Sequence, residues 1–478
     1  MQKAETILSI LSQKSKKNPQ YQYNRIYRLL YNKDFYRNAC LKLAVNSSDI
    51  KSDIKDEYTD NKIDELIRKI KNETYYPKII KNITTATPDR SHGLVQEILK
   101  KILEAIYEPL FSRNCHGFRR DRSCHTALNQ IKKDWRGVKW VIEGDISNIM
   151  ETINHETMMK ILGNKITDNR FLRLINRHLQ AGCLEENKKR RNSSKNPKGG
   201  TLGSVLINIY LNELDGFLET IWDNTGESMG EKEGELKPYQ LQDLDILKER
   251  KGRYSNRIKY CRYEGNFLIG VEDKKDTALR VKEQAQKFLK RELKIDLKPD
   301  RTKIINLKDS RVRFLNYEIS KSLDHGHSTN IKLLVPHEVV NKYISRYTRN
   351  GKAVHLPQRV NQPVYDTIAQ YSHEIRTLYN YYSLAEDVNK KLKKVRHFNY
   401  DSMVKTLAFK HKCSYKKVMD KYGIEVPLKQ NNGTRKLVGV SCRTESGYKT
   451  ITYFNESLIR RDSPLIDLEE VEHLFQNR

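Results

Sequence analysis

The sequence predicts an α+β fold followed by a helical region. The first observation is the order of the expected elements in the first two thirds of the chain: helices, a strand, a helix, a hairpin, a helix and further strands. The second is the change after about residue 330, where the pattern becomes helical and basic. The third is the length of 478 residues, which exceeds one typical core and suits two or three domains.

The N-terminal region is expected to be helical. Residues 21–45 hold aromatic and aliphatic side chains within reach of one another, and a polar stretch from Asn46 to Asp60 is expected to be a loop. Apolar residues in 63–70 and in 94–106 recur at helical spacing, the second with a wide apolar stripe. Both segments are therefore predicted to be helices that bury one face.

The centre of the chain carries the signals for strands. A short apolar run over 140–142 leads to Gly144-Asp145, which indicates a buried strand with an acid at its end. Residues 258–271 are expected to form a β-hairpin that turns near 264–266. The other elements expected here are helices over 205–214 and 278–289, and short strands near 303–305 and 312–319.

The composition points to a polyanionic partner. Lys and Arg outnumber Asp and Glu by 89 to 60, a formal charge of +29, so nucleic acid is the leading candidate partner. No stretch reaches the roughly 18 consecutive apolar residues of a membrane helix, and no membrane partner is expected. The seven cysteines form no CxxC pair, which argues against a zinc site or a disulfide framework. We expect no metal site and no cofactor.

Four sequence blocks carry the most specific signal. The first is HGFRRDRSCHTAL at 116–128, and the second runs from Glu143-Gly144-Asp145-Ile146 to Thr152-Ile153-Asn154-His155. The third joins PKGG at 197–200 to NIYLNELD at 208–215, and the fourth is RYEGNFLIG at 262–270. In this order they resemble blocks of the group II intron reverse transcriptases, whose fourth block reads RYADDFLIG. Asn380-Tyr381-Tyr382 and TLAFKHK at 406–412 resemble the maturase domain, domain X, of the same proteins.

The resemblance covers about residues 22–425 and implies a domain order. It implies degenerate fingers at 1–130 and a reverse-transcriptase-like palm at 131–325, with an exposed insertion at about 223–257. A helical thumb or maturase domain X at 326–425 is implied next, and the role of a short tail at 426–478 is left open. The chain looks closest to degenerate maturases of organelle introns, including those of euglenoid chloroplasts.

The blocks also differ from the family where its polymerase chemistry resides. Three aspartates of the family hold two divalent metals, and this sequence has Asp145, Gly265 and Asn266 at those positions. Glycine offers no ligand and asparagine is neutral, whereas Mg²⁺ prefers carboxylate oxygens. Glu264 is one residue out of step, so its side chain should face the other way. We expect an inactive palm without catalytic residues, and we interpret Asp145 as a strand-end acid kept for hydrogen bonding.

Clusters of basic residues are the expected RNA-binding sites. Within the clusters near the C-terminal side, Lys405, Lys412 and Lys416 are expected to share one helical face. The alternatives are solvated helix faces, a mobile charged loop at 188–191, and internal pairing of the arginines at 119–122. The candidate residues are Arg119, Arg122, Lys188, Lys189, Arg190, Arg191, Lys393, Lys394, Arg396, Lys405, Lys410, Lys412 and Lys416.

These observations predict an intron maturase, an RNA-binding cofactor that assists splicing of a group II or related group III intron without reverse-transcriptase activity. The alternatives are a general organellar RNA chaperone and an active polymerase with an altered metal site. Frequent Lys, Asn, Ile and Tyr suit A/T-rich codons and an organelle genome, with a plastid favoured and a mitochondrion as the alternative. Intron RNA is the expected partner, and the sequence leaves open a homodimer or additional splicing proteins.

Overall fold

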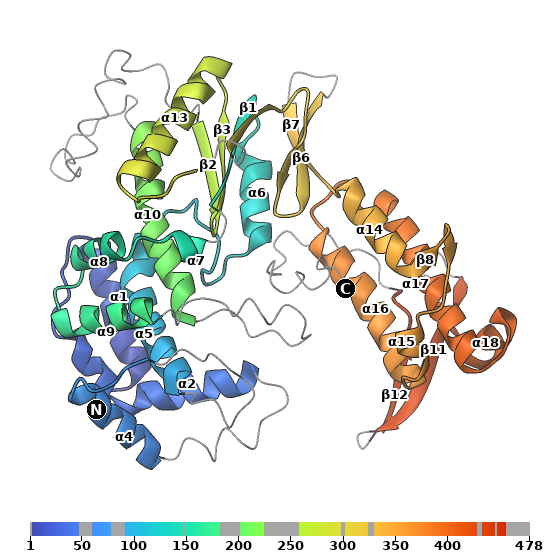
Figure 1. Cartoon of the computed structure of the whole chain (residues 1–478). Helices are drawn as coiled ribbons and strands as arrows, with labels where there is room; N and C mark the ends of the chain where they lie inside the picture. The colour runs from blue at the N-terminus through green and yellow to red at the C-terminus, as the bar shows by residue number, and fades with distance from the viewer. Residues whose placement is uncertain are drawn as a thin grey trace. The chain divides into compact units, whose positions relative to one another are not determined.

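The computed structural model describes residues 2–46, 60–77, 91–146, 149–181, 201–223, 258–297, 302–323, 329–427, 433–444 and 447–455. The chain divides into two compact units, the first formed by 1–120 and 140–304 and the second by 121–139 and 305–478. Helices and small sheets alternate in both, which confirms the α+β class (Figure 1). The expected insertion at 223–257 and the basic loop at 188–191 lie outside the described residues.

The first unit is rich in helices. They are α1 (Ala4–Lys17), η1 (Ile26–Tyr31), α2 (Lys33–Asn46), α4 (Asp60–Lys71), α5 (Ser91–Tyr107), η2 (Glu108–Leu110), α7 (Ile149–Thr152), α8 (His155–Gly163), α9 (Asn169–Gln180), α10 (Thr201–Asp223) and α13 (Lys275–Arg291). The predicted helices over 63–70, 94–106, 205–214 and 278–289 are confirmed as α4, α5, α10 and α13. The predicted helical opening over 21–45 is in part wrong, because a 3-10 turn precedes α2 and the unpredicted α1 lies before both.

The palm sheet of this unit has the strand order β2-β3-β1-β4. Its strands are β1 (Trp140–Asp145), β2 (Ile258–Tyr263), β3 (Asn266–Val271) and β4 (Thr302–Asn306). Strands β2 and β3 form the predicted hairpin, in which Tyr263 pairs with Asn266 across a two-residue turn. On its other edge β3 pairs antiparallel with β1, so that Asn266 stands opposite Asp145. The hairpin therefore brings its turn to the end of β1.

Helix α10 connects the sheet to the other helices of the first unit. Figure 1 shows α1, α2, α4, α5, α8 and α9 gathered at one end of this unit, with α10 running from them along the sheet. The apolar stripe of α5 from Leu94 to Ile106 is fully buried. Phe217 of α10 stacks on Phe288 of α13 with ring centroids 4.3 Å apart. One continuous apolar core thus holds α10 in place against the strands.

The second unit begins with a small sheet. Strands β5 (Val312–Phe314), β6 (Tyr317–Leu323) and β7 (Thr329–Leu334) are antiparallel, and helix α6 (Cys124–Asp134) packs against β7. Tyr317 packs on Tyr382 at 5.0 Å between ring centroids, and the His125 ring lies 2.6 Å from the Tyr381 carbonyl oxygen through Nε2. These contacts fix the start of the helical region.

The remainder of the second unit mixes helices and strands. Its elements are α14 (His337–Tyr347), β8 (Thr348–Arg349), β9 (Lys352–Ala353), α15 (Pro357–Val360), α16 (Val364–Tyr381), α17 (Val388–Lys410), α18 (Tyr415–Tyr422), β10 (Gly423–Pro427), β11 (Thr434–Thr444) and β12 (Gly447–Thr452). Helices α14 and α16 each pack along α17. The β10-β11-β12 sheet packs on α16, and Phe454 beyond it contacts Tyr379 at 5.6 Å between ring centroids. The prediction of helices alone from 330 to 423 is wrong at β7, β8 and β9.

Candidate functional site

The hairpin turn of the palm consists of Glu264 and Gly265. Glu264 has φ 56°, a left-handed conformation that costs energy for a residue with a side chain. The Gly265 carbonyl oxygen accepts a hydrogen bond from the Ile146 N–H at 3.0 Å. A Cβ atom on Gly265 would lie 2.6 Å from the Ile146 carbonyl oxygen. As the turn stands, position 265 has no room for the aspartate side chain that the family resemblance implies there.

The segment from Asn114 to Gly117, which includes the start of the block at 116–128, packs against this turn and β2. The His116 N–H donates to the Arg262 carbonyl oxygen at 2.8 Å, and the Arg262 N–H donates to the Asn114 carbonyl oxygen at 2.8 Å. Cys115 of this segment thereby forms a parallel bridge to Arg262 of β2. A Cβ atom on Gly117 would lie only 2.5 Å from the Glu264 backbone nitrogen, so glycine is required for this close approach. The segment 114–117 therefore supports the turn through its backbone.

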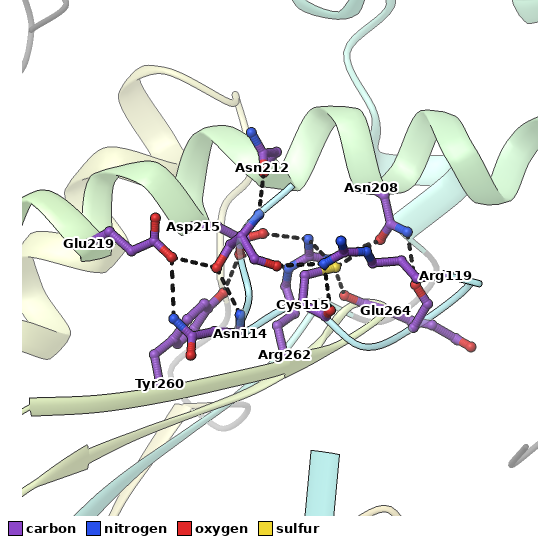
Figure 2. A network of polar contacts seen from close by, with 12 residues as sticks. Asn114, Cys115, Arg119, Asn208, Asn212, Asp215, Glu219, Tyr260, Arg262 and Glu264 are labelled. Atoms are coloured by element: carbon purple, nitrogen blue, oxygen red, sulfur yellow. Dashed lines mark hydrogen bonds and ion pairs between the residues drawn. The ribbon is translucent and has the colours of Figure 1, made fainter. Parts of the chain in front are cut away.

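A buried polar network joins β2 to α10 (Figure 2). Arg262 and Asp215 form an ion pair at 2.6 Å, and both side chains have an exposed fraction of 0%. Arg262 also donates to Asn208 Oδ1 at 3.2 Å, and the Tyr260 hydroxyl donates to Asp215 Oδ1 at 2.8 Å. Burial lowers the pKa of Arg262, but the neighbouring Asp215 carboxylate outweighs it and raises that pKa overall. The network keeps a charged guanidinium inside the fold.

The same network occupies Arg119, one of the predicted RNA-binding residues. The Arg119 guanidinium donates to Glu108 Oε1 at 2.9 Å and to the Ser112 and Cys115 carbonyl oxygens at 2.5 and 3.0 Å. Its side chain is only 7% exposed. These partners support the alternative of internal pairing for Arg119, whereas contact with RNA stays a prediction for this residue.

The palm residues do not fit the two divalent cations of an active polymerase. Asp145 supplies one half-exposed carboxylate at the end of β1, and its cross-strand neighbour Asn266 supplies a neutral amide. Gly265 supplies only backbone atoms, and its Cα faces the Ile146 carbonyl oxygen. Mg²⁺ is usually held by one or two carboxylates together with substrate phosphates and water. A pair of such ions that clamps the attacking and leaving oxygens needs carboxylates on more than one side, and one carboxylate does not supply them. Within the described residues, no three His, Cys, Asp or Glu side chains gather as metal ligands.

A different arrangement occurs at the C-terminal end of α17. Lys405 Nζ donates to the Ala353 carbonyl oxygen at 2.7 Å. Lys410 Nζ donates to the carbonyl oxygens of Val360 and Gln362 at 3.0 and 2.9 Å. Both lysines were predicted to bind RNA, and the structure shows that their ammonium groups also hold the loop between β9 and α16. Lys405 is nevertheless exposed along its side chain.

The predicted common face of Lys405, Lys412 and Lys416 is wrong. Helix α17 ends at Lys410, and Lys412 adopts φ 48°, which a continuous right-handed helix does not permit. Ser414 then caps α18 by accepting from the Lys417 N–H at 3.4 Å. Lys412 and Lys416 are therefore exposed on the turn and on the next helix, not on one face with Lys405.

The remaining predicted RNA-binding residues are dispersed. Lys393 and Lys394 are exposed on α17. Arg396 is half-buried, with its guanidinium carbon 5.9 Å from the centroid of the Phe454 ring. Arg122 is half-buried at the start of the second unit. The four basic residues at 188–191 lie outside the described part of the chain.

Sequence reasoning missed one residue, His355, which contacts the end of α17. His355 stacks on Phe409 with ring centroids 4.1 Å apart and an interplanar angle of 8°. Phe409 stood out as an aromatic residue among lysines, but His355 lies more than fifty residues earlier in a short connection. No local pattern connects the two rings, since only the tertiary fold brings the connection onto α17.

The antiparallel strands β1, β2 and β3, with an aspartate at the end of β1 beside the β2–β3 turn, fit the palm of a reverse-transcriptase-type protein. Comparison with known families agrees: residues 90–319 match the family "Reverse transcriptase (RNA-dependent DNA polymerase)", and residues 329–456 match "Type II intron maturase". The group II intron-encoded protein LtrA of Lactococcus lactis is 30% identical, covering 91% of this chain and 84% of LtrA. The chain therefore belongs to the family of group II intron-encoded proteins.

Two further relatives are less similar, and this chain matches only part of the length of each. The "Uncharacterized 91 kDa protein in cob intron" of Schizosaccharomyces pombe is 28% identical, over 89% of this chain and 59% of the relative. The "Uncharacterized mitochondrial protein ymf11" of Marchantia polymorpha is 26% identical, over 72% of this chain and 57% of the relative. Among the described residues, no helix combines the length and apolar character needed to cross a bilayer.

Proposed function

We propose that this protein is an intron maturase that binds its intron RNA and assists splicing without synthesising DNA. The observation that carries the proposal is the contrast between the palm turn and the maturase region in one chain. The palm keeps only Asp145 of the three metal-binding aspartates that the family resemblance implies. A Cβ atom at Gly265 would also lie 2.6 Å from the Ile146 carbonyl oxygen. The maturase match over 329–456 meanwhile extends through the basic α17 and the β10-β11-β12 sheet.

The work assigned to the protein is the neutralisation and positioning of RNA phosphates. Exposed ammonium groups such as those of Lys393, Lys394, Lys412 and Lys416 suit this role, because each neutralised phosphate releases counterions. Structured RNA is recognised largely through its shape, its backbone and its 2′-hydroxyls. In this proposal the transesterification steps belong to the RNA, and the protein lowers the magnesium concentration at which the RNA reaches its active fold.

We also propose that the protein works in an organelle. Residue usage that suits A/T-rich codons supports this, as does the likeness to a Marchantia protein described as mitochondrial. A plastid and a mitochondrion are both consistent with this support. Whether the intron belongs to group II or to a related reduced type is a question for the RNA itself.

The test of the proposal uses the full chain and candidate intron RNAs. Crosslinking in the native compartment, followed by sequencing of the bound RNA, should give reads concentrated on one intron. The purified protein should then accelerate splicing of that intron at low magnesium and give no product in primer extension. Reads spread over many introns would replace the proposal with a general RNA chaperone. Primer extension that is abolished by Asp145→Ala would replace it with an active polymerase.

A further inference from the structure

We infer that the stacked rings of Phe409 and His355 form a platform on which an unpaired base of the RNA stacks. The inference rests on the proposed function, and it adds a base contact to what is otherwise a phosphate-binding surface. The two rings lie nearly parallel, 4.1 Å apart between centroids and 8° from coplanar. Phe409 is 57% exposed, which is unusual for a residue type normally buried in a core.

The platform is held rigidly by hydrogen bonds on both sides of His355. The Val354 carbonyl oxygen accepts from Ser402 Oγ at 2.7 Å, and the Leu356 N–H donates to Thr406 Oγ1 at 3.0 Å. One residue earlier, Lys405 binds the Ala353 carbonyl oxygen at 2.7 Å. Consecutive turns of α17 thus fix the connection that carries His355. A prepared site of this kind loses little conformational entropy when a ligand binds.

The charge around the platform selects nucleic acid as its occupant. From Lys405 to Lys417 the chain carries five lysines and no acidic residue. Lys412 and Lys416 are exposed directly after the helix end that bears Phe409. An apolar protein partner would need a wider apolar surface than the separate exposed rings of Phe409 and Tyr415 among these lysines. A nucleotide satisfies both features, because its base stacks on the ring and its phosphate meets the ammonium groups.

The platform should take a single-stranded or bulged base and not a paired one. Bases inside an RNA helix already stack on their neighbours, whereas unpaired bases have free π-faces for aromatic side chains. Stacking tolerates every base, because each has such a face. The platform therefore positions the RNA without reading a sequence. It also contributes affinity that does not depend on counterion release, so its effect should be the same at low and high salt.

The experiment compares three substitutions at one exposed position. Phe409→Ala and Phe409→Leu remove the aromatic face, and Phe409→Trp keeps it. The control is Leu279→Ala, since Leu279 is an exposed apolar residue of α13 in the first unit. Binding is measured with the intron RNA over a range of salt concentrations. A single-stranded RNA carrying 2-aminopurine reports stacking through quenching of its fluorescence, and thermal unfolding checks that each variant folds.

We expect Phe409→Ala and Phe409→Leu to weaken binding by about 10-fold with an unchanged salt slope and less quenching. Phe409→Trp and Leu279→Ala should bind as the parent protein does. His355→Ala, which removes the ring behind Phe409, should weaken binding less. Parent-like binding and quenching in Phe409→Ala would overturn the inference, as would full affinity in Phe409→Leu. If the parent protein itself fails to bind the intron RNA, the proposed function fails instead.

Discussion

The palm turn and the end of α17 use similar residues in opposite ways. In the palm, the guanidinium groups of Arg262 and Arg119 point inward and bind carboxylates and backbone carbonyl oxygens. At the end of α17, Lys405 also binds a carbonyl oxygen, but Phe409 and Lys412 are exposed. Both regions carry well-preserved family blocks.

The difference teaches that a family motif can have a structural role of its own, apart from the reaction with which the motif is associated. The palm blocks form a closed network in which Gly117 supports Glu264 and Arg262 neutralises Asp215. Such a network is difficult to break, because a buried charge without a partner destabilises the fold strongly. These blocks therefore contribute to the stability of the fold, whether or not the palm binds metal ions. The residues at the end of α17 have partners on one side and an open surface on the other.

The largest expected effect follows from breaking the buried ion pair of the palm. Asp215→Ala leaves the Arg262 guanidinium charged and buried, so the free energy of unfolding should fall by about 3–5 kcal/mol. Denaturant unfolding of the full chain measures this. The double variant Asp215→Leu with Arg262→Met is the matched control and should recover much of that stability. An Asp215→Ala protein as stable as the parent would contradict the closed network.

A second prediction concerns restoring the missing carboxylates of the turn. Gly265→Asp forces a side chain against the Ile146 carbonyl oxygen and should reduce the free energy of unfolding by about 1–3 kcal/mol. Asn266→Asp is nearly isosteric and should fold normally. The variant with both changes should still fail in primer extension, since the turn must move before it can hold metal ligands. Gly265→Ala is the control that measures the steric cost without the added charge. DNA synthesis by the variant with both aspartates would contradict the prediction.

Much of the palm was predictable because its signals are local. The apolar stripes of α5 and α13 have helical spacing, and the hairpin of β2 and β3 is two apolar runs around a two-residue turn. The loss of ligands at Gly265 and Asn266 is visible from the motif alone. That Gly265 also packs on Ile146 was not predictable, because the contact joins residues 119 positions apart in the chain.

The second unit was harder to predict, and the reason is the same. The strands β8 and β9 are very short and pack on α14 and α17, and β11 and β12 pack on α16. Their pairing therefore depends on the helices that they cover and not on periodicity. Lys405 and Lys410 looked like a solvated face or an RNA contact, yet their carbonyl partners lie some fifty residues earlier. Lys412 was expected on a helical face, but its positive φ places it in the turn after α17.

A third prediction concerns the exposed lysines that follow the end of α17. The double variant Lys412→Glu with Lys416→Glu should weaken binding of the intron RNA and flatten the plot of log affinity against log salt by roughly 0.7–0.9 for each phosphate that is no longer neutralised. Filter binding at several salt concentrations measures both. Lys287→Glu, an exposed position on α13, is the control for general charge reversal. Lys405→Glu should additionally disturb the connection that carries His355, because its ammonium group holds Ala353.

The smallest effect is expected at Asp145. Comparing it with the effect at Phe409 shows directly which of the two regions supports splicing. Asp145 lies at the end of β1 opposite Asn266, with no second carboxylate at Gly265 to share a metal with it. Asp145→Ala and the milder Asp145→Asn should therefore leave splicing support at low magnesium unchanged. In the same assay, Phe409→Ala should clearly decrease the splicing support at low magnesium.

If Asp145→Asn instead abolished splicing support while the protein stayed folded, the palm would carry chemistry that its closed network does not suggest. The residue would then act on RNA or on a metal through its single carboxylate. If both Asp145 variants are neutral, the palm serves the maturase as a rigid support. Selection on the two regions then differs in kind: the palm blocks are constrained by buried partners, and the end of α17 is constrained by the RNA outside it.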